Sequence, residues 1–249
     1  AEPLDRPVAK PNQVVGEEVR RAVAALGPGD VLLLENIRFD PREEANDPEF
    51  ARELASLADV FVNDAFGAAH RAHASTTGVA AYLPAVAGKL LQSELDALGR
   101  LLVAAERPFW AIVGGAKVSD KLRVLRRLLE RCDGLIIGGG MANTFLAAQG
   151  LSVGASRVEA DLVDEARAFL DQAAARGVRV LLPEDVVVAA LVAADAEARV
   201  VPVTAVPEGS LILDIGPASA QIFTQALSTA RTIFWNGPLG VFEWPAFAA

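Results

Sequence analysis

Cysteine is almost missing from this sequence, which has one, Cys132, in 249 residues. A single cysteine excludes a disulfide within the chain, and we expect a reducing, cytoplasmic setting. Long apolar runs are missing too, because the longest windows, such as 186–194, are too short to span a membrane. Residues 1–6 are polar and no apolar stretch follows them, so we recognise no signal peptide. These features exclude disulfide-rich and membrane-spanning classes.

Basic residues are outnumbered, with 23 Lys and Arg against 32 Asp and Glu and a net charge of −9. An acidic chain repels nucleic-acid backbones, so we expect no nucleic-acid partner, although a local basic cleft for a small phosphate stays open. Apolar residues make up 52% of the chain and charged residues 22%. This composition provides a sizeable core and disfavours disorder, and the length suits one large domain or two smaller ones.

Strand and helix patterns alternate along the chain. We predict strands over 31–34, 60–62, 109–113, 135–137, 178–182, 211–215 and 232–235, and helices over 16–26, 47–58, 88–105, 118–131, 141–148, 159–176 and 218–230. Such alternation with apolar strands predicts parallel sheets covered on both faces, with strands 31–34 and 60–62 buried. Ligands of such sheets gather at the carboxyl ends of the strands.

Other segments carry more local expectations. Residues 1–12 are rich in proline, and we expect them to be irregular. The acidic segment 43–47 is expected to be a solvated loop. Asp47 and Pro48 have the residue types of a helix N-cap and a first helical position. The helix near 88–105 is interpreted as the connection between two domains.

The most informative stretch is 108–121, PFWAIVGGAKVSDK. An apolar strand runs into Gly114 and Gly115, and a helical pattern follows from Val118. This arrangement offers unpaired N–H groups and the positive end of a helix dipole to an anion. Lys117 and Lys121 are four residues apart and are expected to share a helix face. Two cations at the start of a helix indicate that an anion binds there. The alternative is a pair of solvated lysines on a surface turn.

Glycine clusters follow several predicted strands, at 114–121, 138–140, 216–217 and 236–240. Glycine lets a phosphate or a flat base approach the backbone closely, so each cluster is a candidate nucleotide or anion cradle. None has the spacing GxxxxGK[ST] or GxGxxG, which argues against a P-loop and against a dinucleotide-binding dehydrogenase. Ordinary turn chemistry is the alternative for each cluster taken singly.

Three further polar features are candidates for chemistry. Arg38 and Arg71 each follow a predicted strand and could clasp a phosphate or carboxylate, the alternative being structural ion pairs. His70 and His73 have a metal-like spacing, but no third ligand accompanies them and we expect no metal site. Glu243 lies in an apolar stretch and could accept hydrogen bonds from a ribose, the alternative being a solvated loop acid.

Taken together, six stretches resemble the phosphoglycerate kinase family in order along nearly the whole chain. They are LLLENIRF (32–39), VNDAFGAAHRAHAS (62–75), ERPFWAIVGGAKVSDK (106–121), LIIGGGMANTFL (135–146), LPEDVVVA (182–189) and IFWNGPLGVFEW (233–244). The resemblance implies two doubly wound, Rossmann-like parallel-sheet α/β domains joined by a hinge helix, both incomplete in this chain. It places a partial triose-binding domain at 1–87, the hinge helix at 88–106 and a nucleotide-binding domain at 107–249.

The resemblance also implies an activity, reversible phosphoryl transfer from 1,3-bisphosphoglycerate to ADP in glycolysis, which gives 3-phosphoglycerate and ATP. Mg²⁺ would be carried by the nucleotide, and the family is typically monomeric. The implied triose-binding residues are Arg38 and Arg71, and the implied catalytic lysines are Lys117 and Lys121. The implied nucleotide-binding residues are these two lysines with Gly114, Ala116, Gly138, Gly139, Leu213, Asn236, Pro238, Gly240, Val241 and Glu243.

The chain departs from the family pattern in three places. The family's first segment, with RVDFNVP-like and HLGRP-like motifs, is absent, and so is its last segment, with a GGGDT-like loop. Ile212 stands where many members carry glycine near the base. We therefore expect little or no turnover from this chain. The alternatives are a nucleotide-binding fragment without catalysis and a fold remnant that binds nothing.

Overall fold

The computed structural model describes residues 5–248, which form two compact units. The first unit is Ala1–Arg100 and the second is Leu101–Ala249, so the division falls within helix α4 (Lys89–Val103). The structure confirms the helix predicted near 88–105, whereas the predicted domain boundaries stay a prediction. No helix among the described residues combines the length and the apolar composition of a membrane span.

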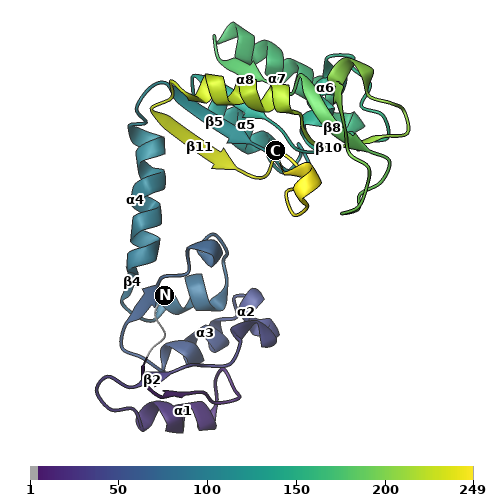
Figure 1. Cartoon of the computed structure of the whole chain (residues 1–249). Coiled ribbons are helices and arrows are strands. Elements are labelled where there is room, and N and C mark those ends of the chain that lie inside the picture. Colours follow the sequence, from purple (N-terminus) through teal and green to yellow (C-terminus); the bar gives the residue numbers. More distant parts are fainter. Residues whose placement is uncertain (1–4, 249) are drawn as a thin grey trace. The chain divides into compact units, whose positions relative to one another are not determined.

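Short strands and helices alternate in the first unit (Figure 1). They are β1 (Val8–Ala9), α1 (Glu17–Ala24), β2 (Val31–Leu32), α2 (Pro41–Glu44), α3 (Pro48–Ala55), β3 (Phe61–Asn63) and β4 (Ala85–Ala87). The strands form two parallel pairs, β1 with β2 and β3 with β4. Residues 1–4 of the segment expected to be irregular lie outside the described residues.

Two helices of the first unit begin at an aspartate followed by proline. Asp47 Oδ1 accepts hydrogen bonds from Glu49 N at 3.0 Å and Phe50 N at 2.8 Å, which confirms the predicted N-cap. Asp40 caps α2 in the same way, through Arg42 N at 3.0 Å. The sequence analysis missed this second cap.

The strands of the first unit are less buried than the sequence predicts. Leu33, next to β2, is 57% exposed, and Val62 of β3 is 54% exposed. Each strand belongs to a two-stranded sheet, and the core that the described residues form, around Phe50 and Ala74, covers only part of these sheets. The expectation of strands buried on both faces was therefore wrong here.

The second unit contains the main sheet, which is parallel with strand order β11-β5-β6-β7. Its strands are β5 (Phe109–Val113), β6 (Gly134–Ile137), β7 (Arg179–Leu181) and β11 (Thr232–Asn236), and its helices are α5 (Leu122–Leu129), α6 (Ala142–Ala148), α7 (Val163–Ala175) and α8 (Pro217–Leu227). The structure thus confirms the predicted α/β class with parallel, Rossmann-like sheets.

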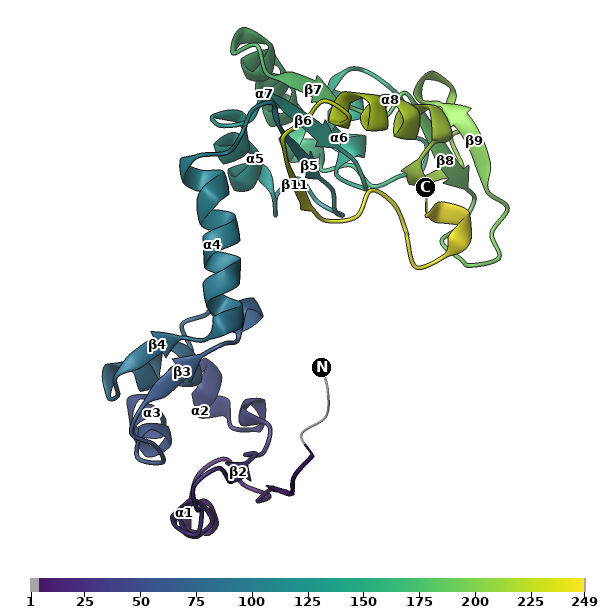
Figure 2. The same ribbon diagram turned by 60° about the vertical axis from the view of Figure 1, so that its left-hand side comes forward.

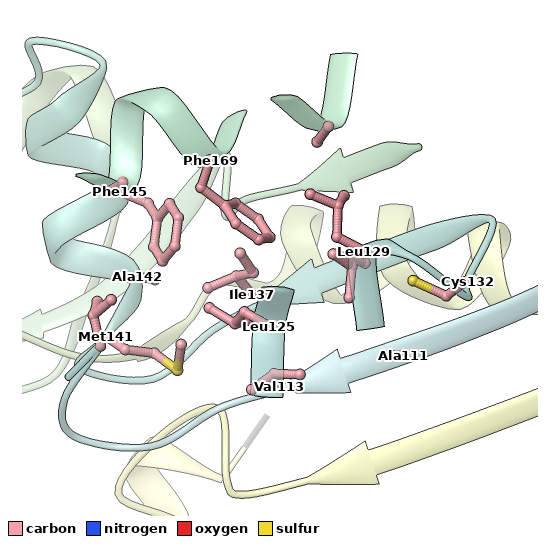
Figure 3. Close-up of a cluster of buried hydrophobic side chains, with 14 of the residues drawn as sticks. Ala111, Val113, Leu125, Leu129, Cys132, Ile137, Met141, Ala142, Phe145 and Phe169 are labelled. Atoms are coloured by element: carbon pink, nitrogen blue, oxygen red, sulfur yellow. The ribbon is translucent and has the colours of Figure 1, made fainter. Parts of the chain in front are cut away.

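Side chains of β5 alternate between two hydrophobic clusters. Phe109, Ala111 and Val113 pack with residues of α5, α6 and α7, as Figure 3 shows for part of this cluster. Trp110 and Ile112 pack toward α8 on the other face. All five residues of β5 are buried, as the continuous apolar run predicts. The central strand and its carboxyl end are therefore held rigidly.

The second unit also contains an antiparallel sheet with the spatial strand order β10-β8-β9, of which Figure 2 labels β8 and β9. Its strands are β8 (Asp185–Ala189), β9 (Arg199–Pro202) and β10 (Leu211–Ile215). The sequence analysis predicted β10 as part of a parallel sheet and missed β8 and β9. No α-helix lies between consecutive strands of this sheet, and such connections permit antiparallel pairing, whereas parallel neighbours need a crossover.

Candidate functional site

Glycines bring three loops into direct backbone contact at the carboxyl ends of β5, β6 and β11. A Cβ atom on Gly114 would lie 2.0 Å from the carbonyl oxygen of Pro238. Gly139 has a φ of +68°, and a Cβ there would lie 2.8 Å from Gly115 N. These positions accept only glycine without a shift of the backbone. The clusters predicted at 114–121, 138–140 and 236–240 therefore lie together.

Backbone hydrogen bonds join the same three loops. Gly114 N donates to Asn236 O, Gly139 N donates to Leu239 O and Met141 N donates to Gly115 O, each at 2.9 Å. Because each bond crosses from one loop to another, none of the loops can move alone. The site is preorganised around a common backbone framework.

A cavity of about 410 Å³ lies beside these loops. Its lining includes seven of the predicted nucleotide-binding residues, namely Ala116, Gly139, Leu213, Pro238, Gly240, Val241 and Glu243. Ile212 also lines it. The other five predicted residues do not line the cavity, namely Gly114, Lys117, Lys121, Gly138 and Asn236. A cavity with one apolar side and a glycine backbone on the other suits a flat base with attached phosphates.

The two predicted lysines lie on a turn and not on a helix. Helix α5 begins at Leu122, and Lys121 is the residue before it, so the prediction that Lys117 and Lys121 share a helix face was wrong. Lys121 Nζ donates a hydrogen bond to Asn236 Oδ1. Lys117 is half-buried and has no hydrogen-bond or ion-pair partner among the described residues. Of the two, Lys117 is the cation left to meet an anion.

The side-chain carboxylate of Glu159 accepts hydrogen bonds from the backbone amides next to these lysines. Glu159 Oε2 accepts hydrogen bonds from Val118 N at 2.5 Å and Ser119 N at 3.1 Å, and Glu159 Oε1 accepts one from Ser119 Oγ at 2.6 Å. Burial raises the pKa of Glu159, but the bonds from Ser119 and Val118 outweigh it and hold that pKa below its ordinary value. The expectation that these amides face a bound ligand was wrong, because Glu159 is their anion.

The Gly216–Pro217 cluster is filled in a similar way. Asp185 accepts hydrogen bonds from Ala218 N at 3.1 Å, Ser219 N at 2.7 Å and Ser219 Oγ at 2.6 Å. Gly216 lets this carboxylate approach, because a Cβ there would lie 2.3 Å from Asp185 Cγ. Asp185 therefore caps α8, and the prediction of an anion cradle for a ligand at this cluster was wrong.

The Asp185 cap of α8 should make the free energy of unfolding depend on pH in the acidic range. Burial raises the pKa of Asp185, but hydrogen bonds from Ser219 and Ala218 bring it below its ordinary value of 3.8. A depressed pKa means that the ionised cap stabilises the fold fully above about pH 4 and loses its effect as pH falls through the lower folded value. We expect Asp185→Asn to cost about 1 kcal/mol at pH 7 and less at pH 3, measured by urea unfolding. A cost that does not change with pH would contradict this assignment.

In the first unit, the structure places the two predicted arginines differently. Arg38 forms an ion pair with Glu44, which is the structural alternative that the sequence left open. Arg38 also lines a cavity of about 240 Å³ together with Glu43 and His73. Arg71 is exposed, does not line this cavity and has no side-chain partner among the described residues. Their joint role in binding a ligand stays a prediction.

Glu43 is buried, which the sequence analysis did not predict. The residue is 1% exposed, and its carboxylate accepts hydrogen bonds from Ser75 N at 2.8 Å and Ser75 Oγ at 2.6 Å. His73 Nδ1 lies 3.7 Å from Glu43 Oε1, too far for a hydrogen bond. The expectation of a solvated acidic loop over 43–47 was therefore wrong at its first residue.

Metal-binding residues do not gather around the histidine pair. Within residues 5–248, no group of three or more His, Cys, Asp or Glu side chains is arranged to hold a metal ion. His70 is exposed, and His73 Nδ1 lies near the Glu43 carboxylate.

The comparisons with known proteins agree on one family. The sequence profile of the family described as "Phosphoglycerate kinase" matches residues 1–249. The chain belongs to the phosphoglycerate kinase family.

Relatives of several lineages share much of the sequence. The phosphoglycerate kinase of Moorella thermoacetica is 63% identical over 98% of this chain and 62% of its own length. "Phosphoglycerate kinase 3, cytosolic" of Arabidopsis thaliana is 57% identical over 97% of this chain and 60% of its own length. The chain therefore spans about three fifths of the curated phosphoglycerate kinases that it matches.

Solved phosphoglycerate kinases share the fold. The structure from Coxiella burnetii has a TM-score of 0.80 and 45% identity, with 97% of this chain and 61% of that chain covered. The structure from Pyrococcus horikoshii OT3 has a TM-score of 0.87 and 32% identity, with 98% and 64% covered.

The sequence analysis missed several residues of this phosphoglycerate kinase cavity. Asp214, Asn143, Ser156 and Arg157 also line it. Asp214 is 4% exposed, and a Cβ on Gly240 would lie 2.0 Å from Asp214 Oδ1. A signal for Asp214 was available, because it is the one charged residue in the apolar strand LILDI. The other three lie in segments without such a contrast.

Proposed function

We propose that the second unit binds the nucleotide of a phosphoglycerate kinase, and that the complete enzyme transfers a phosphoryl group from 1,3-bisphosphoglycerate to ADP. The cavity of about 410 Å³ carries the proposal, because its lining joins apolar side chains of β10 to the glycine backbone of three loops. In this proposal, Leu213 and Val241 contact the base. Glu243 accepts hydrogen bonds from the ribose.

The phosphates would extend toward the turn that carries Lys117 and Lys121. Phosphoryl transfer needs in-line positioning and neutralisation of charge more than a covalent nucleophile. Two ammonium groups and the amides of the glycine loops supply both. Lys121 is already oriented by Asn236, whereas Lys117 is available to the transferred group. Mg²⁺ would be carried by the nucleotide's phosphates.

Arg38 and Arg71 would bind the triose, 3-phosphoglycerate or its bisphosphate. A guanidinium can contact a phosphate or carboxylate through two N–H groups. Arg38 would exchange the carboxylate of Glu44 for that of the ligand, and this pair is exposed enough for the exchange to cost little. We still expect little or no turnover from the 249-residue chain.

A nucleotide-binding function without catalysis is the second candidate. It is favoured by one observation: the lining of the cavity of about 410 Å³ comes from the second unit alone. Nucleotide binding then needs nothing from the first unit. Measurable affinity for MgADP together with an absence of phosphoryl transfer would select this candidate.

Titration calorimetry with MgADP tests the proposal. We expect the chain to bind MgADP, and we expect Lys117→Ala to weaken binding about tenfold, because one charge-assisted contact to phosphate is lost. Adenosine carries no phosphate, so its affinity should not change. Lys89→Ala is the matched control, because Lys89 is exposed on α4 and does not line the cavity. Equal MgADP affinities of the parent and Lys117→Ala would contradict the role of Lys117.

A further inference from the structure

The turn over 117–121 is held at two points. Glu159 binds its first half through Val118 N, Ser119 N and Ser119 Oγ. Asn236 binds its end through Lys121 Nζ. Within the turn, Lys121 N and Leu122 N both donate to Val118 O, at 2.9 and 2.8 Å. The Glu159 carboxylate is therefore the side-chain group that anchors the backbone next to Lys117.

Glu159 is itself fixed by the core. Its backbone N donates to Thr144 Oγ1 at 3.2 Å, and Thr144 on α6 is 1% exposed. The residue stands directly before the short 3-10 turn Ala160–Leu162 that leads into α7. Glu159 thus connects the packed helices α6 and α7 to the turn over 117–121. Movement of this turn would break the three hydrogen bonds to the Glu159 carboxylate.

Lys117 has no comparable support of its own. Its neighbour Val118 is completely buried, which fixes the chain on one side, but the half-buried Lys117 side chain has no partner among the described residues. The direction of its ammonium group therefore follows from the conformation of the turn. A group that fixes this conformation also decides where the ammonium group can be.

We propose that Glu159 is a positioning residue for Lys117. By accepting hydrogen bonds from the amides of the turn, Glu159 orients the lysine toward the terminal phosphate of the nucleotide. The inference rests on the proposed nucleotide function. The Glu159 carboxylate also excludes phosphate from the amides of Val118 and Ser119, which would otherwise form a second anion site next to the nucleotide site. The depressed pKa of Glu159 keeps the carboxylate ionised near neutral pH.

The test compares Glu159→Gln with the parent chain in two measurements. The first is the affinity for MgADP and for adenosine by calorimetry, and the second is amide hydrogen exchange at Val118 and Ser119. Glu165→Gln is the matched control, because Glu165 lies on α7 and pairs with Arg126 instead of the turn. Ser119→Ala removes one of the three hydrogen bonds and leaves the backbone bonds in place.

We expect Glu159→Gln to weaken MgADP binding about tenfold, to leave adenosine binding unchanged and to speed exchange at both amides. Ser119→Ala should have a smaller effect and Glu165→Gln none. Glu159→Asp, whose shorter side chain keeps the charge, should restore part of the MgADP affinity if charge at the turn matters. Unchanged MgADP binding in Glu159→Gln would overturn the inference, as would an equal loss for adenosine, which indicates general damage to the cavity.

Failure of the proposed function has a different signature. If the parent chain binds neither adenosine nor MgADP, the nucleotide function fails for this chain. The amide exchange then decides the inference: unchanged protection of Val118 and Ser119 in Glu159→Gln overturns it, and lost protection upholds Glu159 as the anchor of the turn.

Discussion

Gly114→Ala is expected to lower the free energy of unfolding of the second unit by about 3 kcal/mol and to abolish binding in the large cavity. The added Cβ would lie 2.0 Å from Pro238 O and 2.7 Å from Pro238 C. Both are backbone atoms, so no side-chain rotation relieves the overlap. The loop after β11 must move away, and it then loses the bond from Gly114 N to Asn236 O.

Tryptophan fluorescence during urea unfolding provides the measurement. All 3 tryptophans, at 110, 235 and 244, belong to the second unit, so the signal reports that unit alone. Gly209→Ala is the matched control, because Gly209 belongs to the second unit and a Cβ there meets nothing within 4 Å. If Gly114→Ala unfolds at the same urea concentration as the parent, the close loop contact is not part of the native structure.

Glu43→Ala is expected to destabilise the first unit by about 3 kcal/mol, because it leaves two partly buried donors without an acceptor. Ser75 N and Ser75 Oγ both lose their partner, and no other acceptor is recorded for either among the described residues. The change also empties the space of a side chain that is 1% exposed. Glu43→Gln keeps the shape and one acceptor, so its cost should be intermediate.

Residue-resolved amide exchange measures this effect, since exchange at Ser75 and in α3 reports the first unit. The adjacent Glu44 provides the control, because its side chain is 64% exposed and pairs only with Arg38 among the described residues. Glu44→Gln should change stability by no more than about 0.5 kcal/mol. Equal effects of the changes at Glu43 and Glu44 would show that burial of Glu43 contributes nothing.

The sequence predicted features that depend on neighbouring residues. The buried strand β5, the cap at Asp47 and the three glycine loops all followed from patterns within about ten residues. The structure brings the three loops together at the strand ends, and seven predicted residues line one cavity, while their role in binding stays a prediction.

Features that depend on distant residues were missed. Glu43 meets Ser75 across 32 positions, Asp185 meets Ser219 across 34 and Glu159 meets Ser119 across 40. No local pattern distinguishes these carboxylates from solvated ones. The antiparallel pairing of β8 with β10 was missed for the same reason, because residues 185–189 and 211–215 are distant in the sequence and no strand was predicted over 185–189.

Those three carboxylates share one arrangement: each receives both the N–H and the hydroxyl group of a serine. Because the carboxylate is tethered within the folded chain, its effective concentration at the serine is far above that of free phosphate in solution. Each therefore acts as a permanent intramolecular competitor at a turn that would otherwise attract inorganic phosphate. An acidic protein can in this way restrict phosphate binding, since the amides of these three turns are already saturated by its own side chains.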